Sequence, residues 1–309
     1  MRTAPLPRTD LVASNLILGL MRIEALSNEE IRALVRTALD AGITVFDHAD
    51  IYGSERHGCE ARFGEAVSFT PAERERVLVQ SKVGIRDGYF DFSAEHILRS
   101  VDESLAALRL EHLDLLLLHR PDALVEPDEV AAAFDALQGA GKVRHFGVSN
   151  HTPGQIELLQ RSVRQPLAVD QVQLSIAHAP LVAAGVAANM AEEVQSTDRD
   201  NGLLDYSRLH DITLQAWSPF QSAATGRVFL GDRERYGVLN DELDALAAAY
   251  GVTPTAIAVA WINRHPADIQ VVVGSTTPQR ITDAAAGSEL PLTRPEWYRL
   301  FTAAGHLLP

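Results

Sequence analysis

Short apolar runs alternate along this 309-residue chain with longer segments in which apolar residues recur every three or four positions. The first pattern is typical of strands buried on both faces, and the second of helices with one buried face. The apolar runs predict eight strands, at residues 15–20, 43–46, 77–82, 113–118, 143–149, 168–174, 212–217 and 269–273. The periodic segments predict helices at residues 29–39, 58–69, 94–109, 129–137, 153–160, 239–250 and 254–263, and an outer amphipathic helix at 295–304.

Residues that cap helices support these boundaries. Ser27, Ser93 and Thr152 precede predicted helices, and Gly42 follows one. The segment Leu181–Leu209 is the least regular part of the chain. We expect a long loop there with a short helix before His210, and both a functional rim loop and a surface insertion fit its pattern.

Eight strands with helices between them, and no linker rich in Pro, Gly or Ser, favour an α/β fold of one closed (β/α)8 TIM barrel. We expect a single domain over residues 1–309. The alternative is a doubly wound open sheet, which would need a glycine-rich turn after its first strand. The segment Gly19-Leu20-Met21-Arg22 does not supply that turn.

Composition narrows the class of protein. The net charge of −14 argues against a nucleic-acid or anionic-membrane partner. The single cysteine, Cys59, excludes an internal disulfide and a multi-cysteine metal site. The N-terminus lacks the apolar stretch of a signal peptide, and no segment has the length and apolarity of a membrane span. We therefore expect a cytoplasmic enzyme, and a monomer because no long apolar stripe is left unpaired.

Candidate chemistry lies at the ends of the predicted strands. Asp47, Lys82 and His119 each lie at the C-terminal end of a different strand, and Tyr52 lies on the loop after the first of these strands. Lys82 is one of only two lysines among the 27 basic residues. A barrel brings the C-terminal ends of its strands to one rim, where it builds its active site.

These four residue types together suit a proton donor. A tyrosine hydroxyl has a pKa near 10. A neighbouring ammonium lowers that pKa, and a carboxylate keeps the ammonium charged despite burial. A histidine on a facing strand can hold a carbonyl oxygen beside the hydroxyl. The pattern therefore predicts that Tyr52 protonates an oxygen that acquires negative charge.

Two other chemistries remain open from the residues alone. A buried lysine can attack carbonyls, as in a Schiff-base lyase, but Asp47 would keep Lys82 protonated. The run Asp47-His48-Ala49-Asp50 suggests the ligands of a metal hydrolase. Adjacent strand residues point to opposite faces, however, so we expect no metal site.

Several segments closely resemble the aldo-keto reductase superfamily, in its bacterial oxidoreductase branch. They are residues 42–53, 80–82, 113–122, 141–150, 170–175 and 216–219. The resemblance implies a (β/α)8 barrel that transfers hydride from NADPH to an aldehyde or ketone. It assigns the catalytic roles to Asp47, Tyr52, Lys82 and His119. A regulatory subunit that binds NADP and turns over little is the alternative within the same family.

The resemblance also implies a cofactor site. Its nicotinamide end would contact Ser149, Asn150 and Gln171, with Trp217 stacked on the ring and Ser218 beside the pyrophosphate. The adenosine 2′-phosphate would lie near Gly274, Ser275 and Arg280. Three residues in the segment at the end of the first strand, Gly19, Met21 and Arg22, would also lie near the cofactor. Some relatives carry a lysine at the position of Gly274, so its absence weakens the preference for NADP without cancelling it.

Overall fold

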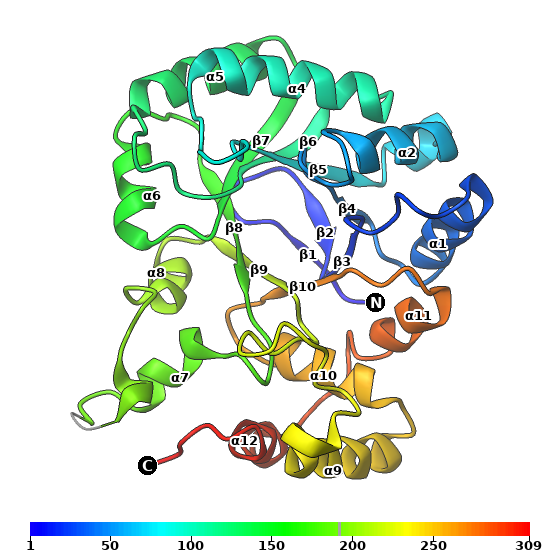
Figure 1. Ribbon diagram of the computed structural model, residues 1–309, viewed down its shortest axis with the longest axis vertical. Coiled ribbons are helices and arrows are strands. Elements are labelled where there is room, and N and C mark those ends of the chain that lie inside the picture. Colours follow the sequence, from blue (N-terminus) through cyan, green and yellow to red (C-terminus); the bar gives the residue numbers. More distant parts are fainter. Residues whose placement is uncertain (191–192) are drawn as a thin grey trace.

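The computed structural model describes residues 1–190 and 193–309. Eight parallel strands close into a barrel in the order β10-β3-β4-β5-β6-β7-β8-β9 (Figure 1). The strands are β3 (Leu16–Gly19), β4 (Val45–Asp47), β5 (Leu78–Val83), β6 (Leu113–Leu118), β7 (Val143–Ser149), β8 (Leu167–Gln173), β9 (Thr213–Trp217) and β10 (Gln270–Val273). The predicted barrel is confirmed and the open sheet was the wrong alternative. Each predicted strand lies within two residues of its observed position.

Helices surround the barrel (Figure 1). They are α1 (Asn28–Asp40), α2 (Gly58–Ala66), α3 (Pro71–Arg74), α4 (Ala94–Leu108), α5 (Pro127–Gly139), α6 (Pro153–Gln160), α7 (Pro180–Val186), α8 (Leu203–Leu209), α9 (Arg233–Tyr250), α10 (Pro254–Asn263), α11 (Pro278–Ala285) and α12 (Arg294–Ala303), with a 3₁₀ turn, η1 (Val194–Ser196). Ser27 accepts a hydrogen bond from Glu30 at the start of α1, as its capping role predicts.

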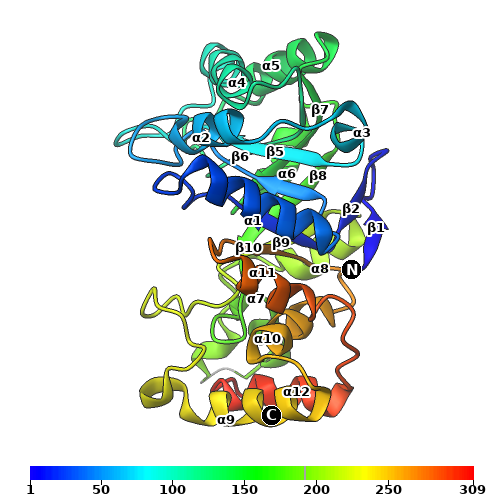
Figure 2. The same ribbon diagram turned by 90° about the vertical axis from the view of Figure 1, so that its right-hand side faces the viewer.

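The helices at 295–304 and 239–250 are confirmed, as α12 and the larger part of α9. These two helices pack side by side, away from the barrel (Figure 2). No single helix of the described residues is long and apolar enough to cross a membrane. Taken together α9 and α10 would meet that criterion, but they are bent by 94° relative to each other.

The segment Leu181–Leu209 contains more helix than predicted. The short helix before His210 is present as α8, but residues 181–186, expected to be part of the loop, belong to α7. Pro180 at the first helical position and the high helix propensity of alanine explain the difference. Residues 191–192 of this segment lie outside the described residues.

A hairpin that the sequence did not predict lies at one end of the barrel (Figure 2). Its strands β1 (Thr3–Pro5) and β2 (Val12–Ser14) are antiparallel and only three residues long. Leu6, Leu11 and Ala13 of the hairpin are buried. They pack with the lowest row of barrel residues, among them Ile17, Val45, Leu78, Leu115 and Val272. This apolar plug closes the lower end of the barrel.

In the two strands that carry Asp47 and Lys82, the residues facing the barrel interior change from apolar to polar along the strand. In β5, Leu78 belongs to the lower apolar cluster, and Gln80 and Lys82 follow on the same face because side chains alternate. In β4, Val45 lies low and Asp47 lies one layer higher. The polar residues of successive strands therefore meet at the open rim.

Candidate active site

Three of the four predicted catalytic residues form one contact group at the rim. The ammonium of Lys82 lies 2.7 and 2.8 Å from the two carboxylate oxygens of Asp47. It also donates to the Tyr52 hydroxyl at 3.1 Å and to the His48 carbonyl at 2.8 Å. The Lys82 ammonium thus donates to three residues, and these three hydrogen bonds fix its side chain. The Tyr52 and His119 rings meet edge to face with centroids 5.9 Å apart, so the fourth residue borders the same space.

Lys82 remains charged although it is only 1% exposed. Burial by itself lowers the pKa of Lys82, but Asp47 and Tyr52 outweigh burial and the net pKa lies above that of an ordinary lysine. A protonated lysine is a poor nucleophile. The ion pair therefore argues against Schiff-base chemistry at Lys82.

The pKa of Tyr52 departs from the sequence expectation. Burial raises this pKa more than the Lys82 ammonium lowers it, so the net direction is upward from the ordinary value. The Lys82 ammonium does lower the pKa of Tyr52, as expected, but by less than burial raises it. Tyr52 keeps its proton at neutral pH, which is the form required of a proton donor.

His119 is a neutral imidazole. Burial lowers its pKa well below the ordinary value, and the positive charges of Lys82 and Arg120 lower it further. Its Nδ1 is buried without a hydrogen-bond partner among the described residues. A neutral ring can donate one hydrogen bond to a carbonyl oxygen without adding a charge to the site.

Glutamines inside the barrel support Asp47, a role that the sequence interpretation missed although it named Gln171 as a nicotinamide contact. Gln80 and Gln171 each donate to Asp47 Oδ1, at 2.5 and 3.0 Å. Both also donate to Gln215 Oε1, at 2.9 and 3.0 Å, and Gln215 donates to Gln270 at 3.0 Å. Strand alternation was a usable signal, because Gln80 lies two residues before Lys82. The four amides link β5, β8, β9 and β10 beneath the rim.

The residues expected near the nicotinamide lie together but are already hydrogen-bonded to one another. Ser149 Oγ donates to the Gln171 carbonyl at 2.7 Å and accepts from Asn150 Nδ2 at 2.8 Å. The Trp217 indole N–H donates to Asn150 Oδ1 at 3.0 Å. Of the Gln171 amide, the nitrogen is held by Asp47 and Gln215, while its oxygen accepts nothing from the described residues. Gln171 thus retains an acceptor for a ligand.

Most of the residues expected near the phosphates lie at the ends of β3 and β10, and β10 is the neighbour of β9 in the barrel. Arg22 Nη1 donates to the Gly274 carbonyl at 3.1 Å, which joins the loop after β3 to the loop after β10. Gly19 lies against this junction, since an added Cβ would lie 3.4 Å from Gly274 Cα. Met21 is exposed beside them.

The start of α11, near the expected position of the 2′-phosphate, is not covered by a side-chain cap. Its N-cap residue Thr277 makes no side-chain cap, and Ser275 Oγ accepts from the Thr277 N–H at 3.2 Å. Arg280 is exposed and forms no ion pair among the described residues. Ser218 stands apart after β9, where its hydroxyl donates to Gln221 at 2.8 Å.

The motif Asp47-His48-Ala49-Asp50 is not a shared ligand set. Asp47 faces the barrel interior, whereas the His48 ring packs edge-on against Phe63 of α2 at 4.7 Å. Asp50 is buried and accepts from Ser100 Oγ of α4 at 3.1 Å. These side chains point to different layers, as strand alternation requires.

Asp170, directly before Gln171, is a fully buried carboxyl whose oxygens have no hydrogen-bond partner among the described residues. Burial raises its pKa to about 8, and the nearby backbone N–H groups of His151 and Asn150 offset only part of that effect. The pKa of Asp170 is therefore higher in the folded state than in the unfolded state. Its contribution to folding stability is fully present below about pH 4, where the carboxyl is protonated in both states, and is lost as the pH rises to about 8.

We expect Asp170→Asn to be more stable than the wild type at pH 8. This advantage should shrink toward pH 5 by up to roughly 1.4 kcal/mol per pH unit. Urea unfolding at several pH values measures the difference. The exposed Asp40→Asn is the control and should show no such trend. A constant difference between Asp170→Asn and the wild type from pH 5 to 8 would contradict the assignment.

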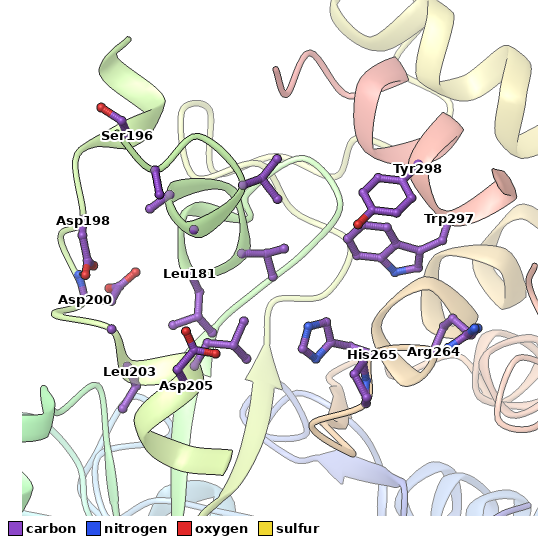
Figure 3. A pocket seen from close by; sticks show the side chains of 18 of the residues that line it. Leu181, Ser196, Asp198, Asp200, Leu203, Asp205, Arg264, His265, Trp297 and Tyr298 are labelled. Atoms are coloured by element: carbon purple, nitrogen blue, oxygen red, sulfur yellow. The ribbon is translucent and has the colours of Figure 1, made fainter. Parts of the chain in front are cut away.

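A cavity of about 720 Å³ lies outside the barrel, between the α7–α8 segment and the helices α10 and α12 (Figure 3). Asp198, Asp200 and Asp205 line one side, and His265 and Trp297 the other (Figure 3). None of the predicted catalytic or cofactor residues borders it. The predicted catalytic and cofactor residues therefore lie at the polar rim of the barrel and not in this cavity.

Comparison with known proteins agrees with the fold. The model of the aldo/keto reductase family matches residues 15–303. The chain belongs to the aldo/keto reductase family, a family of oxidoreductases. It is 36% identical over 302 residues to Oxidoreductase YdhF of Escherichia coli (strain K12), covering 94% of this chain and 93% of that protein.

A second relative has a named activity. The chain is 37% identical over 282 residues to a 6-dehydroglucose reductase of Novosphingobium aromaticivorans, covering 89% of this chain and 86% of that protein. Among solved structures, the thermostable aldo-keto reductase Tm1743 in complex with the inhibitor epalrestat has a TM-score of 0.78 at 25% identity, covering 98% of this chain and 100% of that one. An aldo-keto reductase of Klebsiella pneumoniae in complex with NADPH shares the fold, with a TM-score of 0.72 at 24% identity over 94% of this chain and 90% of that one.

Proposed function

We propose that this protein reduces aldehydes or ketones with NADPH, using Tyr52 as the proton donor. The observation that carries the proposal is the Lys82 ammonium, which contacts both the Asp47 carboxylate and, at 3.1 Å, the Tyr52 hydroxyl. Family membership and the oxidoreductase relatives support the reaction class.

The roles of the residues follow from their contacts. Tyr52 donates its proton to the oxygen of the substrate carbonyl as negative charge develops there. Lys82 lies against the hydroxyl and stabilises the phenolate that remains, and Asp47 balances the buried ammonium. The neutral His119 donates a hydrogen bond that orients the carbonyl. Bound NADPH supplies the hydride.

The nicotinamide end of the proposed site fits this chain. The free oxygen of Gln171 can accept from a carboxamide NH₂, and its fixed nitrogen holds it in that orientation. Asn150 is tied to Trp217, so the indole ring is held as an apolar platform. Ser149 hydrogen-bonds to both Asn150 and Gln171 and so helps to hold them in place. We propose these residues for the nicotinamide, with Ser149 acting mainly through its neighbours.

The phosphate end fits as well. Arg22 brings a guanidinium to the Gly274 carbonyl. Arg280 and the uncapped start of α11 offer a further cation and backbone N–H groups for a 2′-phosphate. We therefore propose NADPH over NADH, with Gly19, Met21, Ser218 and Ser275 lining the remainder of the site.

A panel of aldehydes and ketones, followed by NADPH absorbance with NADH in parallel, tests the proposal. The panel includes 6-dehydroglucose because two relatives carry that reductase name. We expect continuous turnover of at least one carbonyl, with a kcat/KM at least ten-fold higher for NADPH than for NADH.

Other outcomes would point to the alternatives. A single burst of NADPH oxidation followed by stalled turnover would favour a cofactor-binding regulatory subunit. Borohydride trapping of a carbonyl compound on Lys82 would favour the Schiff-base lyase.

A further inference from the structure

Arg120 extends across the mouth of the barrel. It directly follows His119 at the end of β6, yet its guanidinium lies over the Trp217 ring of β9, 5.8 Å from the ring centroid. Two strands, β7 and β8, separate β6 from β9 in the barrel. The side chain therefore spans the opening next to the four candidate catalytic residues.

The charge of Arg120 has no partner within the described residues. Asp122, the nearest acid along the chain, accepts instead from the backbone N–H groups of Phe92 and Leu124, at 3.1 and 2.8 Å. Asp47 is committed to Lys82. No carboxylate lies close enough to raise the pKa of Arg120, and partial burial alone lowers it. Arg120 also acts on the site itself, because its charge lowers the pKa of His119.

An unpaired guanidinium on an aromatic face is well placed to bind an anion. Stacking on Trp217 orients the planar group and leaves its N–H donors free in the plane. Those donors match two oxygens of a carboxylate or phosphate. The residues proposed for the cofactor lie on or after β3 and β7 to β10, and one of them, Trp217, is the ring that the Arg120 guanidinium contacts. Arg120 itself follows β6 beside His119, so its free donors lie where the proposed nicotinamide site meets the catalytic residues.

We infer that Arg120 selects carbonyl substrates that carry an anionic group, such as a carboxylate or phosphate, by binding that group while His119 and Tyr52 engage the carbonyl. The inference rests on the proposed function and deepens it, since it names the class of substrate.

Matched pairs of probes test this inference. Succinate semialdehyde and 4-carboxybenzaldehyde are each compared with their neutral methyl esters, so that two distances between carbonyl and anion are sampled. We expect the wild type to prefer at least one acid over its ester by at least ten-fold in kcat/KM. A charge-assisted hydrogen bond corresponds to roughly ten- to hundred-fold in binding.

Substitution of the arginine locates the preference. Arg120→Gln should lower kcat/KM for the acid by at least ten-fold more than for the ester, mainly through KM. Arg120→Lys should fall between the two, because it keeps the charge but loses the planar fork. Arg99→Gln on α4 removes an exposed arginine of the outer surface and should behave as the wild type.

Three results would overturn the inference. They are equal use of both acids and their esters by the wild type, an equal loss for acid and ester in Arg120→Gln, and a raised Kd for NADPH in Arg120→Gln that accounts for its whole defect. If the wild type reduces the esters but shows no preference for the acids, the inference fails and the proposed function stands. If the wild type reduces neither these probes nor any compound of the broader aldehyde and ketone panel, the proposed function itself fails.

Discussion

Tyr52→Phe is expected to lower kcat by about 10²–10⁴, the range typical of a lost general acid. The substitution removes one oxygen atom. It leaves the ring against His119 and the ion pair of Lys82 with Asp47 in place. Because the hydroxyl acts on the substrate, we expect the Kd for NADPH to change by less than about three-fold on the scale of a single neutral hydrogen bond. Steady-state turnover and cofactor fluorescence titration measure the two quantities.

The matched control is Tyr250→Phe. This tyrosine lies on α9, where its hydroxyl donates to Glu296 at 2.9 Å, far in the fold from the rim. It should turn over as the wild type does. Full activity of Tyr52→Phe would remove the central assumption of the proposed mechanism.

Lys82→Met is expected to abolish turnover and also to destabilise the fold. Asp47 is 2% exposed, and without the ammonium only the amides of Gln80 and Gln171 remain to compensate its charge. Removing one partner of a buried ion pair typically costs about 3–5 kcal/mol of unfolding free energy. The two amides offset part of this, so we expect the lower end of that range. Urea unfolding at neutral pH gives the change.

The double variant Asp47→Asn/Lys82→Met separates the two effects. With both charges removed, most of the stability should return, because no isolated charge stays buried. Turnover should not return, since nothing then stabilises the phenolate of Tyr52. A double variant as unstable as Lys82→Met alone would show that packing of the lysine chain, and not charge, determines the loss.

The barrel and the meeting of the candidate catalytic residues could be predicted because both depend on a simple geometric rule. Asp47, Lys82 and His119 each end an apolar strand, and parallel strands in a closed barrel bring those ends to one rim. The prediction needed only the order of the strands. The upward shift in the pKa of Tyr52 could not be predicted, because it depends on how deeply the ring is buried.

Other features depend on contacts that sequence patterns do not encode. The hairpin strands β1 and β2 are three residues long, too short for a periodic signal. The free oxygen of Gln171 becomes evident only when Asp47 and Gln215 are seen to hold its nitrogen. From the sequence alone, Arg120 is only a polar residue that follows a strand. Its reach to Trp217 depends on side-chain conformation and on barrel closure.

The hairpin plug has a kinetic consequence. Leu6, Leu11 and Ala13 pack against the lower barrel residues, so among the described residues the polar rim is the end of the barrel at which ligands can bind. Under the proposed function, the cofactor and the carbonyl compound would both bind at this rim, so the second to bind would cover the first. The dinucleotide should then bind first and dissociate last, and product inhibition patterns should show this compulsory order.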